Sequence, residues 1–454
     1  MQRALWLVIV LGWVSIASMS VVLLPRQALG ALEDVLYESG KISQEEWLRV
    51  KEEKRQEAAQ GLGQATSPVT EAKWVDSLVW AGDLRLRYGQ FWRYGVGPVG
   101  NDRSRLRFRL RFGPTIKIDD FTIGIRLASG NRSQVSTNQT FDTTFSGKPI
   151  NLDHVFASWN PSSFQVMTLT VGKMPNPFFT HHTWEVLLDQ DITPEGLAQQ
   201  FAWNASPSIS GFLTLGQFVL NEDIADPNQQ WLLAFEGGMT LKVGGGKAGV
   251  GIGYFDATNL DQGGITELSF QQFNSRTNPS GPLPTSGYVN DYDVLNLTAR
   301  FETTVMGLPV DIQGYWVKNL AYEVSCSGSG NTVGACAAGN ARIRNQDEGY
   351  QVGIRVGEAT KARTWEAAYY YKWLQADAVL AALADSDFGD GGTNRRGNVF
   401  WVAYNFYDFL QFRVTFINTK VLDRNLCTGL TPTDLLNACS DDIDRLLVDW
   451  NFKF

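Results

Sequence analysis

The sequence predicts an all-β fold, a transmembrane antiparallel β-barrel of about sixteen strands. Three observations predict it. The stretch Arg103–Phe112 alternates arginines with large apolar residues, the connections between predicted strands are long and tight in turn, and the last strand ends on Phe454. After residue 30 we find no run of about 18 apolar residues, which excludes a helical membrane protein.

The alternating stretch reads RSRLRFRLRF. In a strand, this period of two places every guanidinium on one face and every large apolar side chain on the other. An arginine face cannot enter a dry core without a desolvation cost of several kcal/mol for each unpaired charge. A closed barrel with lipid outside and water inside satisfies both faces. A soluble sheet with a basic outer face fits this single strand equally well, so the rest of the chain has to decide.

The connections favour the barrel. Alternating runs recur sixteen times between Trp74 and Phe454, and every second connection is tight, as in Asn160–Ser163 and Gly244–Lys247. The other connections are long and polar. This segregation is typical of an outer-membrane barrel with both termini in the periplasm, whereas a soluble sandwich has no reason for it. The run at residues 151–160 is ambiguous, because both parities carry apolar residues.

The N-terminal part has a different composition. Residues 1–30 contain an apolar stretch, Ala4–Leu24, before a small-x-small site, and predict a cleaved secretory signal; a retained membrane anchor is the alternative. Residues 31–60 predict a short periplasmic helical segment, with a capping box at Ser43–Glu46. It is either an oligomerisation or envelope-anchoring element or a solvated spacer. Residues 61–73 form a linker, and residues 74–454 the barrel.

The C-terminal strand carries a candidate assembly signal. Trp450, Phe452 and Phe454 continue an apolar face that alternates with polar residues up to the last position. A chain that ends on an aromatic residue at this parity resembles the terminal strand that the barrel-assembly machinery recognises.

These features together resemble the putative porin family of Gram-negative outer membranes, akin to general and phosphate-selective porins. The residues that carry the resemblance are LEDVLYESGKISQEEWLRVKEE, GDLRLRYGQ, RSRLRFRLRFG, FTIGIRLASGN, VGKMPNPF, LLDQDITPEGL and the terminal Phe454. The resemblance implies a porin-like barrel in outer-membrane lipid and lipopolysaccharide, a homotrimer as one expected assembly, and passive diffusion of small hydrophilic solutes or ions. It transfers no catalytic or binding residue to this chain.

Seven arginines on three neighbouring strands are candidates for a basic pore-lining wall. They are Arg85, Arg87, Arg105, Arg107, Arg109, Arg111 and Arg126. The third long loop carries the candidate constriction residues Glu185, Asp189, Asp191 and Glu195. If that loop folds into the pore, it faces the wall across a narrow passage, and such a transverse field sets ion preference. Alternatively, the arginines pair with carboxylates on neighbouring strands and only satisfy the interior.

The four cysteines predict an oxidising compartment. Cys326 with Cys336, and Cys427 with Cys439, lie in two polar loop segments and predict two local disulfides, although three connectivities are formally possible. No histidine or cysteine at ligand spacing indicates a zinc site, so we expect no metal and no cofactor.

Other functions have less support. The net charge is −8, and the basic residues alternate along strands, so nucleic acid is not expected as a partner. His154, His181 and His182 are the only histidines and none adjoins a plausible nucleophile, which argues against an enzyme. Residues 31–73 are too few for the plug domain of a TonB-type transporter. An adhesin or structural barrel, with the long loops as binding surface, remains the alternative to a channel.

Overall fold

A computed structural model describes residues 75–94, 102–178, 186–222, 229–260, 274, 288, 290–323, 325–326, 342–343, 345–389, 391–423 and 442–454. The predicted signal, helical segment and linker lie outside these residues. Among the described residues, no helix is long and apolar enough to cross a membrane.

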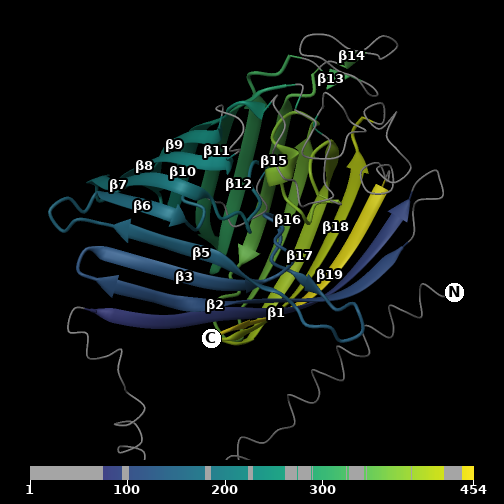
Figure 1. Cartoon of the computed structure of the whole chain (residues 1–454), viewed down its shortest axis with the longest axis horizontal. Helices are drawn as coiled ribbons and strands as arrows, with labels where there is room; N and C mark the ends of the chain where they lie inside the picture. Colours follow the sequence, from purple (N-terminus) through teal and green to yellow (C-terminus); the bar gives the residue numbers. More distant parts are fainter. Residues whose placement is uncertain are drawn as a thin grey trace, which may run out of the picture. The chain divides into compact units, whose positions relative to one another are not determined.

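The described strands close into one antiparallel barrel (Figure 1). The sheet has 17 strands including the two-residue β4, which leaves sixteen long ones, as the sequence predicts. They are β1 (Ser77–Tyr94), β2 (Arg103–Ile118), β3 (Phe121–Ser129), β4 (Gln139–Thr140), β5 (Ile150–Trp159), β6 (Met167–Lys173), β7 (Glu195–Ser206), β8 (Ile209–Asn221), β9 (Gln230–Val243), β10 (Gly246–Ala257), β11 (Tyr292–Val305), β12 (Leu308–Asn319), β15 (Glu348–Gly357), β16 (Trp365–Leu374), β17 (Arg395–Tyr407), β18 (Leu410–Val421) and β19 (Asp442–Lys453). Two further short strands, β13 (Ser325–Cys326) and β14 (Arg342–Ile343), pair with each other.

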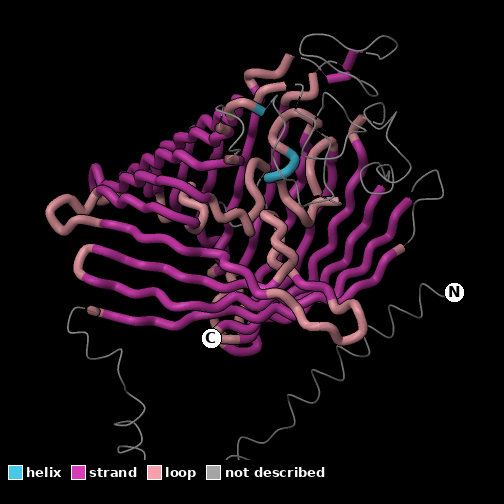
Figure 2. Tube along the Cα trace, viewed as in Figure 1, coloured by secondary structure: helices cyan, strands magenta, loops and turns pink. Residues whose placement is uncertain are grey.

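Barrel closure joins the first strand to the last. β1 pairs with β2 on one side and with β19 on the other, and the C-terminal residue takes part, since the Gly82 amide donates to the Phe454 carbonyl at 2.8 Å. Tight turns, such as Asp119-Asp120 and Gly244-Gly245, lie on the rim where the chain ends. The long connections lie on the opposite rim, as the alternation of connection lengths predicts (Figure 2).

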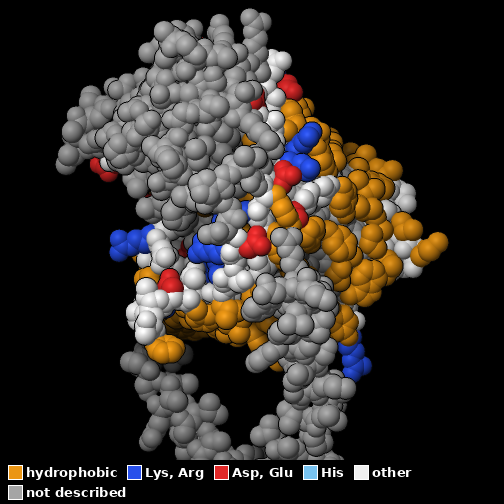
Figure 3. Space-filling model, turned by 90° about the vertical axis from the view of Figure 1, so that its right-hand side faces the viewer, with side chains coloured by type: hydrophobic (Ala, Val, Ile, Leu, Met, Phe, Trp, Pro, Cys, Tyr) orange, Lys and Arg blue, Asp and Glu red, His pale blue; other side chains and the backbone are white. Residues whose placement is uncertain are grey.

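The wall alternates between an apolar outer face and a polar inner face. On β10, Val250 and Ile252 are exposed while Gly251 and Gly253 are buried, and on β9 Phe235 is exposed while Glu236 is buried. Hydrophobic side chains cover much of the outer wall on the right of Figure 3, and charged ones gather nearer its middle. This arrangement suits lipid outside and polar groups inside.

A β-bulge explains the ambiguous run at residues 151–160. Arg126 of β3 pairs with His154, but the next residue, Leu127, pairs with Leu152, so Asp153 is an extra residue in β5. Asp153 and His154 are both buried, and the outward parity changes from even numbers before the bulge to odd numbers after it. The exposed apolar residues on both parities therefore belong to one outer face, while Phe156 packs against the interior.

The hairpin of β6 and β7 is cut short. The last hydrogen bond between the two flanking segments runs from the Met174 amide to the Pro194 carbonyl. Beyond it, Pro175 and Pro177 on one side and Pro194 on the other have no amide hydrogen to donate, so the strand pair cannot continue. The intervening connection turns into the barrel instead of extending the wall.

Two long connections fill part of the lumen. Loop 3 is the connection between β6 and β7 (residues 174–194), and loop 7 is the connection between β16 and β17 (residues 375–394), which contains the turn η3 (Ala381–Leu383). Buried apolar residues of both loops join inner-face residues of the wall in one hydrophobic cluster, for example Leu188, Val379 and Tyr292. Figure 2 shows η3 inside the ring of strands. The apolar cluster anchors both loops away from the rim.

Candidate pore constriction

The arginine wall, defined by the seven predicted positions, begins with a conflict between like charges. In the register of β1 and β2, Arg85 lies opposite Arg109, and Arg87 lies opposite Arg107. Like charges directly opposite each other destabilise a strand pair. The wall can therefore persist only if carboxylates or water offset this repulsion.

Carboxylates on the strands compensate part of the repulsion between the facing arginines. Asp83 on β1 accepts a hydrogen bond from Arg109 Nη2 at 2.8 Å and another from Arg111 Nε at 2.8 Å. Asp449 on β19 accepts two from Arg87, at 2.7 and 2.9 Å, in the bidentate geometry that arginine forms with carboxylates. On β3, Arg126 pairs with the bulge residue Asp153.

Loop 7 supplies a second carboxylate partner for Arg87. Asp387 contacts Arg87 Nη1 at 2.7 Å and Arg445 Nη2 at 3.1 Å. Arg445 Nη1 also donates to the carbonyls of Ser386, Asp387 and Gly389, at 3.1, 2.7 and 2.8 Å. Three carbonyls and one carboxylate therefore hold loop 7 against β1 and β19.

Loop 3 reaches the same wall. Asp191 contacts Arg109 at 3.6 Å and Arg111 at 3.4 Å, and it accepts a hydrogen bond from the Thr137 amide at 3.2 Å. Asp189 forms no ion pair with the described arginines of the wall. It accepts hydrogen bonds from the backbone amides of Asp191 and Ser386, at 2.8 and 2.7 Å.

The two loops are thus joined to each other as well as to the wall. The Asp189 amide donates to the Leu383 carbonyl at 2.7 Å, which complements the bond from Ser386 to the Asp189 carboxyl. Within loop 7, Asp385 receives a hydrogen bond from Lys372 Nζ on β16 at 2.8 Å. The result is one connected set of charges between loop 3, loop 7 and the wall.

The loop carboxyls differ in their acidity. Burial opposes ionisation of Asp387, but Arg87 and Arg445 outweigh it and hold the pKa of this carboxyl well below its ordinary value. Burial likewise opposes ionisation of Asp191, and Arg109 and Arg111 lower its pKa. For Asp189, burial acts together with the neighbouring Asp191 and Asp385 and raises the pKa well above its ordinary value. Asp189 therefore keeps its proton to a higher pH than the other two.

Three arginines of the wall have no carboxylate within ion-pair distance among the described residues. Arg85 donates to the side-chain oxygen of Asn138 at 2.6 Å, and Arg107 donates to the carbonyl of the same residue at 3.4 Å. The guanidinium carbon of Arg105 lies 4.7 Å from the ring centroid of Phe91. These neutral partners orient the three cations without cancelling their charge.

The charged side chains line a cavity of about 360 Å³, to which both the arginine wall and the two loops contribute. Its lining combines Arg85, Arg87, Arg109 and Arg111 of the wall with Asp189, Asp191, Asp385 and Asp387 of the loops. The strand carboxylates Asp83 and Asp449 also line this cavity, so arginines and carboxylates alternate around it. A charged lining of this kind is suited to discriminate between ions.

The remaining residues singled out from the sequence lie away from the arginine wall or outside the described residues. Glu195 is the first residue of β7 and pairs with Lys173 at 2.8 Å, away from the wall. Phe454 is 65% exposed on the outer surface, with its ring against Gly82. The side chains of Glu185, His181, His182 and the four cysteines lie outside the described residues, so the disulfide pairing stays a prediction.

Sequence reasoning missed Asp83, Asp387, Asp449 and Arg445. Asp83 and Asp449 lie at the inward parity of strands that the alternation identifies, so the pattern contained a signal for them. Asp387 had none, because only the fold brings loop 7, about 300 positions along the chain, against Arg87.

A family model matches most of the barrel. The model of the family described as "Putative porin" matches residues 93–264 and 261–454. The chain belongs to the putative porin family. The protein is thus an outer-membrane channel of Gram-negative type, through which small hydrophilic solutes or ions diffuse passively, and the adhesin-type alternative is not favoured. Porin family and fold indicate a channel rather than an enzyme.

Solved structures similar to this porin include OprB of Pseudomonas putida, with 11% identity over 83% of this chain and 94% of that chain and a TM-score of 0.49. OmpF of Salmonella typhi has 12% identity over 83% and 97%, with a TM-score of 0.46. The outer membrane channel DcaP of Acinetobacter baumannii has 12% identity over 83% and 97%, with a TM-score of 0.42. No curated protein matches.

Proposed function

We propose that this porin is a constricted diffusion channel with a preference for small anions. The observation that carries the proposal is the set Arg85, Arg105 and Arg107, which form no ion pair with a carboxylate among the described residues. The remaining arginines of the wall are paired, so these three determine the sign of the potential there. On the far wall, Arg300 and Arg355 both contact Asp311, and further carboxylates lie beside them, so that wall adds little net charge.

Loops 3 and 7 act as the constriction in this proposal. Their apolar residues fill part of the lumen, and their carboxylates Asp191 and Asp387 contact the arginine wall and line the charged cavity with it. Solutes then pass beside the arginine wall, where an anion exchanges contacts between arginines that are already oriented.

Assembly is proposed to follow the family pattern. The barrel-assembly machinery recognises the strand that ends at Trp450, Phe452 and Phe454, the termini face the periplasm, and the outer wall contacts lipid and lipopolysaccharide. A homotrimer is the proposed oligomer. The support is the apolar outer face and the position of Phe454 at the closing seam of the barrel.

Reversal potentials in planar bilayers under a salt gradient test the anion preference. The triple variant Arg85→Gln, Arg105→Gln, Arg107→Gln should form channels whose reversal potential moves toward cations. The matched control replaces the same three residues by lysine, which keeps the charge and should keep the preference. If the glutamine variant forms channels with the parental reversal potential, the three arginines do not set ion preference and the proposal is wrong.

A further inference from the structure

The short hairpin of β6 and β7 leaves a notch in the barrel wall on the long-loop side. Pairing of β5 with β6 begins at Val155 opposite Lys173, so residues 150–154 of β5 extend past the end of β6. Pairing of β7 with β8 begins at Gly196 opposite Phe218, so β8 extends past β7 in the same way. The wall is therefore lower between β5 and β8 than on either side.

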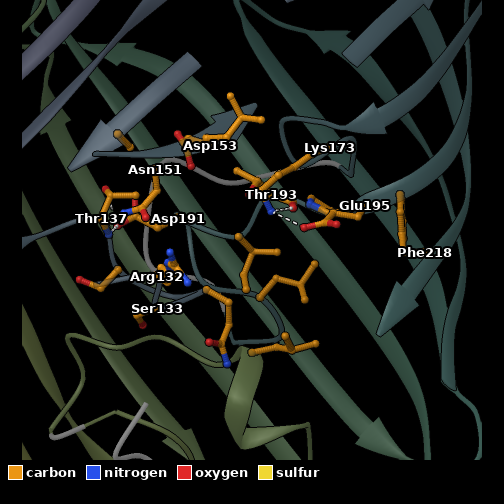
Figure 4. A pocket seen from close by; sticks show the side chains of 18 of the residues that line it. Arg132, Ser133, Thr137, Asn151, Asp153, Lys173, Asp191, Thr193, Glu195 and Phe218 are labelled. Atoms are coloured by element: carbon orange, nitrogen blue, oxygen red, sulfur yellow. Dashed lines mark hydrogen bonds and ion pairs between the residues drawn. The ribbon is translucent and has the colours of Figure 1, made fainter. Parts of the chain in front are cut away.

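A cavity of about 920 Å³ occupies this notch. Its lining includes outward-facing residues, Ile150 and Leu152, each 56% exposed, and buried inner residues, Leu188 and Phe218. Because side chains of both faces line one space, the cavity connects the interior with the outer surface of the wall. Figure 4 shows Asn151, Asp153 and Thr137 on one side of the space and Lys173, Thr193 and Glu195 on the other.

The polar part of the cavity has a single cation without a carboxylate partner among the described residues. The charges of Lys173 and Glu195 pair with each other, Asp153 pairs with Arg126, and Asp191 contacts the arginine wall. Arg132 is exposed at the mouth, and its backbone adopts a φ of 64°, in the left-handed region that a non-glycine residue rarely occupies. Its guanidinium is free to receive an anion.

We propose that the notch is a binding site for an anionic amphiphile with a single apolar chain and a carboxylate or similar acidic head. The chain lies against Leu188, Phe218 and Leu232, and the head contacts Arg132. A cavity with an apolar inner part and a few polar groups at its edge matches the usual anatomy of small-molecule sites. The site is separate from the arginine wall and does not depend on the anion preference.

The physical chemistry of the wall also favours an occupant that comes from the membrane. Residues 150–154 present a strand edge beyond the end of β6, and an open edge is costly where it meets hydrocarbon. An amphiphile in the notch brings the oxygens of its acidic head, which can accept hydrogen bonds, to this edge, while its chain lies between apolar side chains; a lipid chain alone brings no such group. We therefore infer that the ligand enters the notch from the membrane leaflet on the long-loop side.

Decanoate, a ten-carbon carboxylate, is a suitable probe for the full chain in phospholipid nanodiscs. Radiolabelled decanoate should bind with saturation at one site per chain, above the partition into empty nanodiscs. Arg132→Gln should weaken binding about tenfold, as expected for loss of a charge-assisted contact. Arg363→Gln is the matched control, because Arg363 is also exposed with a positive φ, of 66°, but lies in a tight turn on the other rim.

Binding that does not saturate, or equal loss of affinity in both arginine variants, would overturn the site. Whether decanoate enters the notch from the membrane is tested separately, by the rate at which it binds. Leu152→Trp narrows the membrane side of the notch and should slow loading, whereas Ser133→Trp at the loop side should leave the rate unchanged. The reverse result would overturn supply from the membrane, and the ligand would then come from water.

Discussion

Arginines that face each other across two strands are stable only with the right neighbours. In this porin the neighbours of Arg87 are Asp449 on the adjacent strand and Asp387 on a loop that is remote in sequence. A buried guanidinium that loses such a partner costs about 3–5 kcal/mol. Ion pairs therefore add to the apolar cluster in holding the loops against the wall, and the loop carboxylates pair with some of the described arginines but not with others.

The loop carboxyls predict a response to acid. Because the folded pKa of Asp387 and Asp191 is lowered, their contribution to loop attachment is complete above the ordinary carboxyl pKa of about 4 and is lost as pH falls through the folded value. Single-channel conductance should change as pH falls below about 4, when Asp387 and Asp191 take up protons and the loops detach.

The double variant Asp191→Asn, Asp387→Asn provides the control for acid release. At neutral pH it should have the conductance that the parent has in acid, with little further change on acidification. The pKa of Asp189 is raised in the folded protein, so its effect on loop attachment has the opposite pH dependence. The stabilisation that protonated Asp189 gives is present at low pH and is lost as pH rises through its folded pKa. A parental acid response in the double variant would contradict the assignment.

A second prediction about single residues concerns the outer and inner faces of β1. Leu86 is 40% exposed on the outer face between Trp450 and Phe108, and its neighbour Arg87 is buried on the inner face. Leu86→Arg should lower the free energy of unfolding by about 2–4 kcal/mol, because lipid then meets a guanidinium. Leu86→Phe should assemble normally. Heat-modifiable mobility on gels measures both, and equal assembly would show that Leu86 does not meet lipid.

At the scale of elements, the bulge in β5 reconciles an irregular pattern with a regular wall. The extra residue Asp153 lets Leu152 and Val155 lie on the same outer face, although they are three positions apart. It also brings a carboxylate to Arg126. The bulge thus preserves both the apolar belt and the charge balance of the inner face.

Two single-residue deletions test the bulge. Deleting Asp153 removes the extra residue and leaves every other side chain of β5 on its present face, so the porin should still reach the outer membrane, with a modest loss of stability. Deleting Ala157, in the regular part of the strand, reverses the faces of the residues before it and should abolish assembly. The yield of heat-modifiable barrel in the outer-membrane fraction distinguishes them. Equal yields would contradict the register.

At the scale of the whole molecule, closure of the barrel depends on one seam. β1 and β19 pair from Asp83 opposite Lys453 to Tyr94 opposite Asp442, and Phe454 exchanges two backbone hydrogen bonds with Gly82. A barrel leaves no open edge in lipid only when this seam forms. The last residue therefore contributes to closure as well as to the proposed recognition by the assembly machinery.

Deletion of Phe454 should lower outer-membrane assembly sharply. Phe454→Tyr keeps an aromatic ring against Gly82 and should assemble like the parent, whereas Phe454→Ser keeps the backbone bonds and should assemble poorly if the ring is what is recognised. The amount of folded barrel in outer-membrane fractions, compared with refolding of the purified chains in detergent, separates recognition from closure. Unchanged assembly of the deletion variant would contradict both roles.

The sequence by itself determined the strand number, the order of long and tight connections, and the face on which each arginine of the wall lies, because all three follow from local periodicity and turn chemistry. It also pointed to Asp191 as a residue that could face the wall. Only the tertiary structure decided that loop 7 joins loop 3 in the lumen and that Asp387 pairs with Arg87 and Arg445. It also decided that Arg85, Arg105 and Arg107 form no ion pair with a carboxylate in the described part of the chain. The reason is physical: a strand pattern repeats every two residues, whereas an ion pair between a loop and a wall depends on where the closed barrel brings distant parts of the chain together.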